Sequence, residues 1–281
     1  MITNLGDGVV FLFQWRRSEG VSLLTVAAFS ATGLVRHGFT ARTGGVSEPP
    51  YHTLNMGFTV NDDPLHVLEN RRRVATALGV PLTRMVAAKQ VHGDRVALIK
   101  AGDEGRGALT YDDALEDTDA LVSAERGILL STYHADCIPV SVLDPVTPAI
   151  GLAHAGWKGT ALKIAGKAVA KMSSCFGTRP EDCLVAIGPG IGPCCYEVDQ
   201  RVKEVFHRQF AGSSEFFRPV AGGHWHLDLW AANVRALKEA GVKEEHIFVS
   251  SMCTCCNTDT FFSHRKEGGR TGRMASLMML K

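Results

Sequence analysis

Two periodicities of hydrophobic and polar positions run along this chain, and they predict helices separated by short strands. The segment from Asp63 to Gly79 predicts a helix. In this segment apolar residues recur every three or four positions between a capping aspartate, a first-turn proline and a terminal glycine. The same spacing predicts helices over residues 162–172, 202–210 and 228–241.

Short runs rich in β-branched and aliphatic residues predict strands between these helices. They cover residues 95–100, 128–133, 138–143, 149–153, 183–187 and 247–250. Residues 144–148 form a turn-rich link with two prolines, which favours an antiparallel hairpin over a parallel crossover. We therefore expect an α+β fold in which layered mixed β-sheets are flanked by helices.

The rest of the pattern argues for a single domain over residues 1–281. No linker-like stretch divides the chain, and no repeat of roughly 20 to 50 residues recurs. Residues 101–118 combine glycines with acidic residues, and we interpret them as a long surface loop that can move over a site.

Composition and charge narrow the classes of function. The chain has 281 residues, 45% of them hydrophobic, with 30 Lys and Arg against 29 Asp and Glu. This is typical of a globular protein and excludes disorder and collagen-like repeats. A net charge of +1 provides no long-range attraction to nucleic acid or an anionic membrane, so neither is an expected partner.

The lack of a recognisable targeting signal and the usage of cysteine favour a location in the cytoplasm. The most apolar stretch, residues 20–35, is interrupted by serines and threonines and is too short to span a membrane. The first residues lack the order of a secretory signal. In a reducing compartment the eight cysteines are expected to be free thiols or metal ligands rather than disulfides.

Three segments place a candidate metal ligand beside glycine, proline or tryptophan at the end of a predicted strand. They are residues 89–93, 134–139 and 154–160. Their spacing matches no zinc finger, so the fold would have to assemble any ligand set. A single histidine near a strand is more often a hydrogen-bonded structural residue than a ligand.

A series of short motifs resembles one protein family in order from about His37 onward. The motifs are RTGGVS at 42–47, KQVHG at 89–93, TDALV at 118–122, ADC at 135–137, HAGWKGT at 154–160, IGP at 187–189, CYEV at 195–198 and FSHR at 262–265. The family is labelled multicopper polyphenol oxidase or laccase-domain protein, and also purine nucleoside phosphorylase. Ordered motifs over nearly the whole chain are highly specific.

The resemblance implies a zinc ion held by His92, Cys137 and His154, which would also be the catalytic residues. Two imidazoles and one thiolate leave one tetrahedral position open, as in catalytic zinc sites. Asp136 either orients a ligand or accepts a proton, or it caps backbone groups.

The resemblance also implies an activity, the phosphorolysis of adenosine, inosine, guanosine and methylthioadenosine to the base and a ribose 1-phosphate. Adenosine deamination is implied as a companion activity. Arg42, Lys89 and Gln90 are the substrate-binding candidates, with the amides of Gly44 and Gly45 as further phosphate donors. The alternative interpretation is that the two glycines form a tight turn and Lys89 a surface charge.

Other functions stay open at this level. The laccase label implies copper, which the same three ligands would accept, although His224 and His226 form the only His-x-His pair in the chain. A metal-free cysteine hydrolase or peptidoglycan-editing amidase would use Cys137 as nucleophile and His92 or His154 as base. A third interpretation is a nucleotide- or partner-binding protein in which zinc only braces the pocket.

The remaining cysteines and the basic C-terminal segment carry weaker signals. Cys194, Cys195, Cys253, Cys255 and Cys256 are irregularly spaced, and we expect buried or redox-active thiols there in preference to a second metal site. Residues 188–193 predict a rigid turn beside the pocket. Arg265, Arg270 and Arg273 predict a solvated face, with contacts to phosphate or ribose as the alternative.

Overall fold

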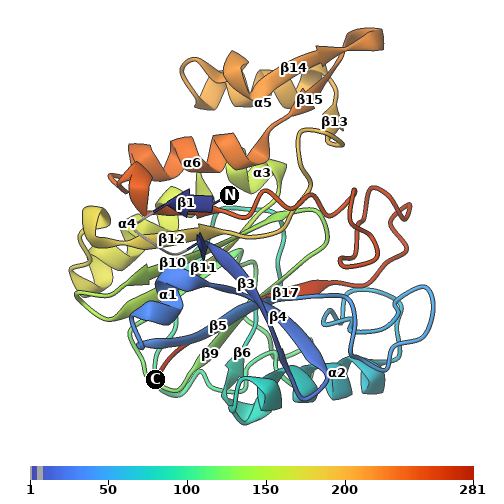
Figure 1. Cartoon of the computed structure of the whole chain (residues 1–281), viewed down its shortest axis with the longest axis vertical. Helices are drawn as coiled ribbons and strands as arrows, with labels where there is room; N and C mark the ends of the chain where they lie inside the picture. Colours follow the sequence, from blue (N-terminus) through green and yellow to red (C-terminus); the bar gives the residue numbers. More distant parts are fainter. Residues whose placement is uncertain (1, 5–8) are drawn as a thin grey trace.

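Two six-stranded sheets packed face to face form the centre of the computed structural model, which describes residues 2–4 and 9–281 (Figure 1). The first sheet has the order β16 (Ile247–Val249), β12 (Leu184–Ile187), β10 (Ile138–Asp144), β11 (Ala149–Ala155), β8 (Ala120–Ser123) and β7 (Val96–Leu98). The second has the order β3 (Phe13–Ser18), β4 (Val21–Val26), β5 (Val35–Thr40), β17 (Met274–Leu280), β9 (Leu129–His134) and β6 (Met85–Val86). Both sheets are mixed, because antiparallel pairs in each are joined by a parallel pair such as β12–β16 or β6–β9.

Alternate residues of each central strand point into two different hydrophobic cores, one between the sheet and its helices and one between the two sheets. In β11, Ala149 and Ala153 pack toward the helices, whereas Ile150 and Leu152 pack toward the second sheet. Side chains of a strand point alternately to the two faces, so a strand buried on both faces is apolar at nearly every position. Strands of this kind position the site rigidly, because both of their faces are packed.

Helices cover the outer faces of the two sheets (Figure 1). The first sheet is covered by α3 (Trp157–Ala161), α4 (Ile164–Phe176) and α6 (Leu229–Glu239). The second is covered by α2 (Pro64–Ala77), while α1 (Ala27–Ala31) connects β4 to β5 and packs against both strands. Gly166 lets α4 and α6 approach closely, since a Cβ there would lie 2.9 Å from the Ala236 carbonyl oxygen.

Aspartate caps fix the starts of the longer helices as the sequence predicts. Asp63 accepts a hydrogen bond from Leu65 N at 2.8 Å, and Asp228 accepts one from Ala231 N at 2.9 Å. The helix expected over residues 162–172 is present as α4, but it begins only after Lys163, whose φ of +61° separates it from α3. The helix expected over 202–210 is α5 (Gln200–Gln209).

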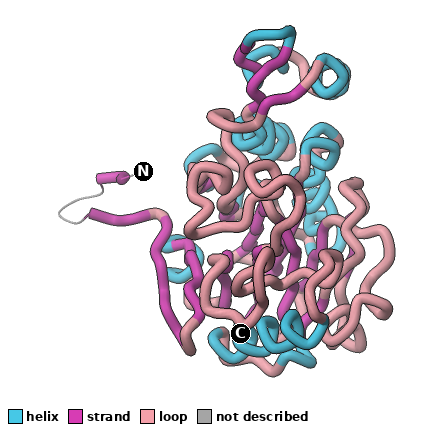
Figure 2. The backbone as a smooth tube through the Cα atoms, turned by 90° about the vertical axis from the view of Figure 1, so that its right-hand side faces the viewer, coloured by secondary structure: helices cyan, strands magenta, loops and turns pink. Residues whose placement is uncertain are grey.

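A smaller unit lies outside the two main sheets. It contains α5 and a three-stranded sheet of β13 (Glu197–Val198), β15 (His224–Leu227) and β14 (Phe217–Val220). Figure 2 shows this unit above the main body, and the hairpin of β1 (Ile2–Asn4) and β2 (Val9–Phe11) projecting to one side. Short 3-10 turns complete the described elements at Leu82–Arg84, Pro180–Asp182, Ser213–Phe216, Ala221–Gly223 and Glu244–His246.

The expected single-domain α+β fold is confirmed, and so is the hairpin of β10 and β11, whose register pairs Asp144 with Ala149. Residues 101–118 contain no helix or strand, as expected for a loop. The strands β3, β4, β5 and β17 were not predicted, although they make up most of the second sheet. In the described part of the chain, no helix has the length and apolar character that crossing a membrane requires.

Candidate active site

His92, Cys137 and His154 come together at one end of the two sheets. Each offers one ligand atom, and the three atoms lie within 4.8 Å of one another. Cys137 lies in the turn between β9 and β10, and the pairing of Pro139 with His154 brings the next strand's histidine beside it. His92 reaches the same point from the loop before β7. The fold thus assembles the set that sequence spacing alone did not define.

Asp119 holds two of these side chains in place. Its carboxylate accepts a hydrogen bond from His154 Nδ1 at 2.8 Å and from the backbone N of His92 at 3.0 Å. The backbone N of Gly93 donates to it at 2.7 Å as well. With Nδ1 engaged by Asp119, His154 presents Nε2 to a ligand, the arrangement of a histidine that binds metal. Asp119 was not among the site residues predicted from the sequence, although it stands directly before β8.

Local backbone geometry makes room for the cluster. His92 adopts a left-handed conformation with φ of +60°, and Asp119 satisfies the backbone amides around it. A Cβ at Gly156 would lie 2.8 Å from the His92 ring and 3.0 Å from Cys137 Sγ. The position therefore requires glycine, which explains the glycine that follows His154 by two residues.

The cluster favours a thiolate in the metal-free chain. Burial disfavours ionisation of Cys137, but His154 and His92 outweigh it and lower its pKa to about 6. Burial likewise opposes protonation of His154, whereas Cys137 and Asp119 outweigh it and raise its pKa to about 9. A thiolate is the form that binds metals and attacks electrophiles.

These donors fit a metal ion with an open coordination position. Two imidazoles and a thiolate, one imidazole being oriented by a carboxylate, are the ligand types that zinc and copper accept. His92, Cys137 and His154 all line a cavity of about 410 Å³, which is in the range of small-molecule sites. A ligand in the cavity can therefore reach the open position.

A neutral histidine lies in the wall of the same cavity. His134 is 2% exposed, and neither ring nitrogen has a hydrogen-bond partner within the described residues. Burial lowers its pKa to about 3, so the ring is neutral and offers one donor and one acceptor. Buried polar groups in native proteins are nearly always paired, so the two unpaired nitrogens of this wall residue make it a candidate for contact with a ligand.

Three arginines line the cavity as well, and none forms an ion pair with a carboxylate of the described chain: Arg71, Arg265 and Arg273. Arg71 is fully buried between the rings of Phe58 and Tyr133, at 4.1 and 4.5 Å from their centroids. Its hydrogen bonds go to backbone carbonyls, among them Met56 O at 2.9 Å. A buried guanidinium without a carboxylate partner favours an anionic ligand.

The residues predicted to bind substrate do not all lie at the cavity. Gln90 lines the cavity, where its amide pairs with the backbone N and O of Tyr133 at 2.7 and 2.8 Å. Lys89 is not among the described residues that line it, and its ammonium binds Glu116 at 2.6 Å.

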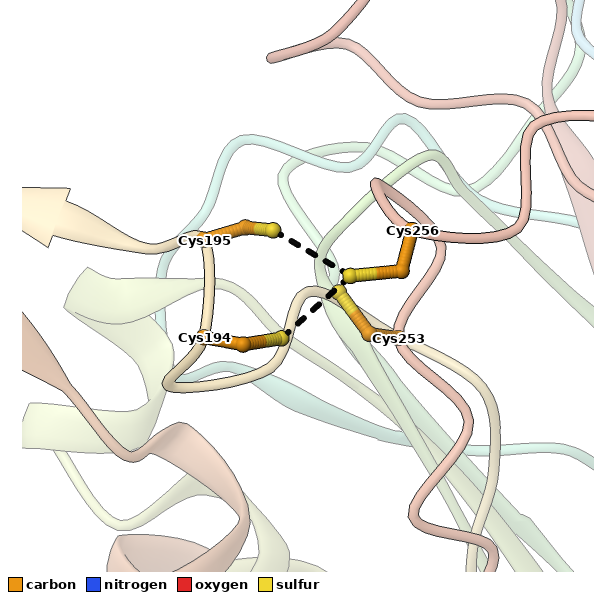
Figure 3. Close-up of side chains that lie close together, drawn as sticks. All are labelled: Cys194, Cys195, Cys253 and Cys256. Atoms are coloured by element: carbon orange, nitrogen blue, oxygen red, sulfur yellow. Dashed lines mark hydrogen bonds between the residues drawn. The ribbon is translucent and has the colours of Figure 1, made fainter.

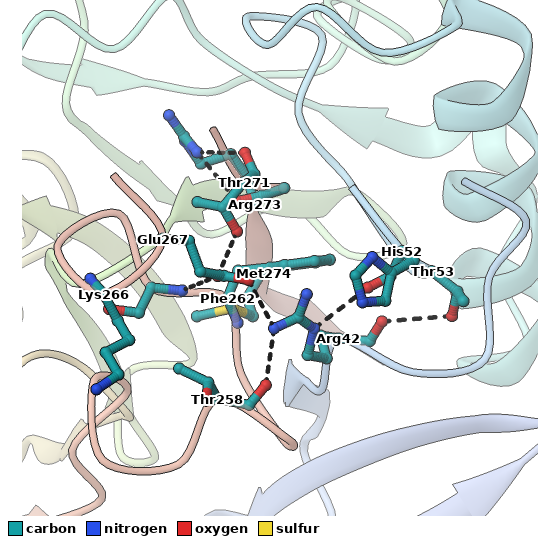
Figure 4. Close-up of polar contacts among 12 residues, drawn as sticks. Arg42, His52, Thr53, Thr258, Phe262, Lys266, Glu267, Thr271, Arg273 and Met274 are labelled. Carbon is teal, nitrogen blue, oxygen red and sulfur yellow. Dashed lines mark hydrogen bonds and ion pairs between the residues drawn. The ribbon is translucent and has the colours of Figure 1, made fainter. Parts of the chain in front are cut away.

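Arg42 also lies outside the lining of this cavity. Its guanidinium pairs with Glu267 at 3.0 Å, donates to Thr258 O at 2.7 Å and stacks on Phe262 (Figure 4). The backbone of Gly45 packs against Thr53, where a Cβ would lie 2.2 Å from the carbonyl oxygen. These contacts give Arg42 and Gly45 structural partners, and their part in binding substrate stays a prediction.

Asp136 serves as an anchor for the loop after β16. Its carboxylate accepts hydrogen bonds from Thr254 Oγ1 and Arg265 N, both at 2.6 Å. Of the two interpretations of Asp136, the capping of backbone groups has direct support in these contacts. Arg265 is exposed, as expected for a solvated face, but it and the half-buried Arg273 also line the cavity.

Comparison with known proteins places these residues in a family context. The family model described as multi-copper polyphenol oxidoreductase laccase matches residues 36–281. A protein named purine nucleoside phosphorylase YlmD from Geobacillus stearothermophilus is 43% identical over 86% of this chain and 88% of its own length. A protein of an unknown prokaryote named adenosine deaminase RL5 is 38% identical over 79% of this chain and 85% of its own length.

A solved structure agrees with this relationship. The crystal structure of YlmD from Geobacillus stearothermophilus matches with a TM-score of 0.91 and 40% identity, covering 96% of this chain and 99% of the other. The fold is therefore shared over nearly the whole length of both chains.

Proposed function

Because the chain belongs to the family described as multi-copper polyphenol oxidoreductase laccase, and several of its relatives are named purine nucleoside phosphorylases, we propose that it is a zinc-dependent purine nucleoside phosphorylase. Its substrates are adenosine, inosine, guanosine and methylthioadenosine together with phosphate. One observation carries the proposal: a three-ligand metal set and three arginines without carboxylate partners face a single cavity. The expected cytoplasmic location belongs to the same proposal.

The metal set has a defined place in this reaction. His92, Cys137 and His154 hold the zinc ion, and Asp119 fixes the orientation of His154. When bound, zinc supplies a Lewis acid at one end of the cavity. The protein's own side chains account for the remaining interactions with the substrates.

The cavity walls suit a purine nucleoside. Tyr133, Trp157 and Tyr196 provide aromatic surface on which a purine can stack. The neutral ring of His134 offers a donor and an acceptor to the polar edge of the base or to the ribose hydroxyls. A protonated histidine would offer only donors, so the lowered pKa of His134 suits this role.

The arginines suit the phosphate. Arg71 is buried and Arg273 is half-buried; neither has a carboxylate partner in the described chain, and both carry guanidinium groups that match phosphate oxygens. In the reaction a phosphate oxygen forms a bond to C1′ of the ribose while the glycosidic bond breaks. The electron pair of the broken glycosidic bond leaves with the purine, which takes up a proton. Arginines that neutralise the phosphate lower the cost of bringing it beside the sugar.

Adenosine deamination is the second candidate, favoured by the relative named adenosine deaminase RL5. In that reaction water replaces the amino group of the purine and ammonia leaves, so no phosphate is consumed. The two reactions are distinguished by their products: adenine and ribose 1-phosphate for phosphorolysis, and inosine with ammonia for deamination.

The test combines metal analysis with product analysis on the purified protein. We expect zinc in the His92–Cys137–His154 site, adenine release from adenosine that depends on phosphate, and loss of both zinc at that site and activity in His92→Ala and Cys137→Ala. Cys175→Ser, a half-buried cysteine on α4, is the matched control and should keep both. Absence of base release from adenosine and inosine with zinc bound would refute the phosphorylase.

Two other outcomes would redirect the assignment. Copper in the site together with oxidation of phenols would favour the polyphenol oxidase. Full activity after chelation, lost in Cys137→Ala, would favour a cysteine hydrolase with the thiolate of Cys137 as nucleophile.

A further inference from the structure

Four cysteines converge at a second place, between the loop before β13 and the loop after β16 (Figure 3). Cys194 and Cys195 come from the first loop, and Cys253 and Cys256 come from the second. The four Sγ atoms lie within 4.8 Å of one another. Cys256 Sγ lies 3.4 Å from Cys195 Sγ and 3.5 Å from Cys194 Sγ.

These separations match a tetrahedral metal–thiolate site. With Zn–S bonds of about 2.3 Å, tetrahedral geometry places the sulfur atoms about 3.8 Å apart. A disulfide requires a sulfur separation of about 2.05 Å. Cys253 and Cys256 also have the C-x-x-C spacing common among structural zinc ligands, which the irregular spacing of the whole set conceals.

Backbone contacts hold the thiols in place. The N–H of Gly192 donates to Cys253 Sγ at 3.2 Å, a contact that stabilises a thiolate. Thr254 N donates to Gly190 O at 3.1 Å, and an isolated β-bridge pairs Gly190 with Cys253, so the two loops are joined beside the cluster. Asn257 Nδ2 caps the turn by donating to Cys253 O at 2.7 Å.

We propose that Cys194, Cys195, Cys253 and Cys256 bind a structural zinc ion as four thiolates. All four tetrahedral positions are then filled by protein, unlike the open site in the main cavity. Binding converts each thiol to a thiolate and releases its proton, with no change in oxidation state. The proposal does not depend on the proposed phosphorylase activity.

Binding of zinc displaces the protons of the thiols, so the affinity of the cluster for zinc should fall as the solution becomes more acidic.

The position of the cluster gives the ion a role in the protein. The first loop carries Ile191 and Tyr196 into the cavity wall, and the second leads on to His264 and Arg265 on the same wall. An ion that joins the loops fixes both parts of this wall. Its loss should loosen the wall and weaken substrate binding more than turnover.

The experiment measures zinc per chain in the whole protein purified under reducing conditions. We expect about two zinc ions in the native sequence and about one in His92→Ala. Cys253→Ser in the His92→Ala background should remove the last ion. Cys255→Ser is the matched control, because Cys255 lies in the same turn outside the cluster, and it should keep both ions and activity.

A second measurement does not depend on removing a cysteine. X-ray absorption of zinc in His92→Ala should give four sulfur neighbours at about 2.3 Å and no nitrogen. One zinc ion in the native sequence and none in His92→Ala would overturn the proposal. So would iron in place of zinc, a disulfide to Cys256 in the reduced protein, or nitrogen ligands in the absorption spectrum.

Discussion

Individual side chains around the cavity have different sets of partners, so single substitutions can separate their roles. Asp119 joins the loop of His92 to the ring of His154, which places one buried carboxylate behind two metal ligands. Arg71 instead joins a helix to the long loop through the carbonyls of Gly107 and Ala108. We therefore expect Asp119 to control the geometry of a bound metal ion and Arg71 to control the charge in the cavity.

Asp119→Asn should lower zinc affinity and activity together by about 10- to 100-fold, since an amide cannot accept from all four donors that the carboxylate now satisfies. Competition with a chelator measures the affinity, and Asp94→Asn serves as control, since Asp94 is a partly exposed aspartate that pairs with Lys167. Unchanged affinity with reduced activity would mean that Asp119 acts on the substrate and not through the metal ligands.

Arg71→Lys should raise the KM for phosphate by about 10- to 100-fold while changing the KM for adenosine little, because a lysine keeps the charge but loses the planar pair of donors. Arg72→Lys, the neighbouring exposed residue paired with Glu69, should leave both constants unchanged. Equal increases in both KM values would instead indicate displacement of the loop that Arg71 supports.

The sequence identified the three metal-ligand candidates but not the residues behind them. His92, Cys137 and His154 are recognisable because their residue types bind metals and their motifs recur in a family. The roles of Asp119, His134 and Arg71 depend on how deeply each side chain is buried and on whether a hydrogen-bond or ion-pair partner lies beside it. Those properties exist only once β8, β9 and α2 are packed together, so composition and spacing gave no signal for them.

Helices with aspartate caps were predictable, whereas the second sheet was not. Asp63 and Asp228 mark helix starts with a local hydrogen bond that needs no tertiary structure. By contrast, β17 has the sequence MASLMML, and every one of its residues is buried. A strand covered on both faces shows no alternation, and methionine and leucine also favour helices, so its sequence does not distinguish the two.

Gly166→Leu should destabilise the protein by about 1 to 3 kcal/mol, because the side chain meets Ala236 of α6 where the two helices touch. Chemical denaturation measures the free energy of unfolding. Ala170→Leu, at an exposed position on the same helix, is the control and should change it little. Equal effects of the two substitutions would contradict close packing of α4 against α6.

At the scale of the whole molecule, the stability of the fold should depend on buried neutral histidines. His37 accepts a hydrogen bond from Val26 N at 2.8 Å, and burial lowers its pKa from 6.5 to about 4. Between these values the unfolded chain binds a proton that the folded chain does not, so the free energy of unfolding falls as the pH falls.

From pH 7 to pH 5 His37 should therefore reduce the free energy of unfolding by about 2 kcal/mol. In His37→Gln an amide oxygen can accept the same hydrogen bond without titrating, so this part of the pH dependence should disappear. Urea denaturation at the two pH values measures it. An identical pH dependence in both proteins would show that His37 is not neutral in the folded state.

The central place of β17 also bears on how the protein is made. This strand lies between β5 and β9, and Ala275 N donates to Thr40 Oγ1, 235 residues away along the chain. During synthesis, β5 and β9 leave the ribosome long before β17, the strand that pairs with both. Until then each has an unpaired edge, and unpaired edges are prone to aggregation. Such distant pairing predicts slow folding and a nascent chain that relies on chaperones until residues 274–280 have emerged.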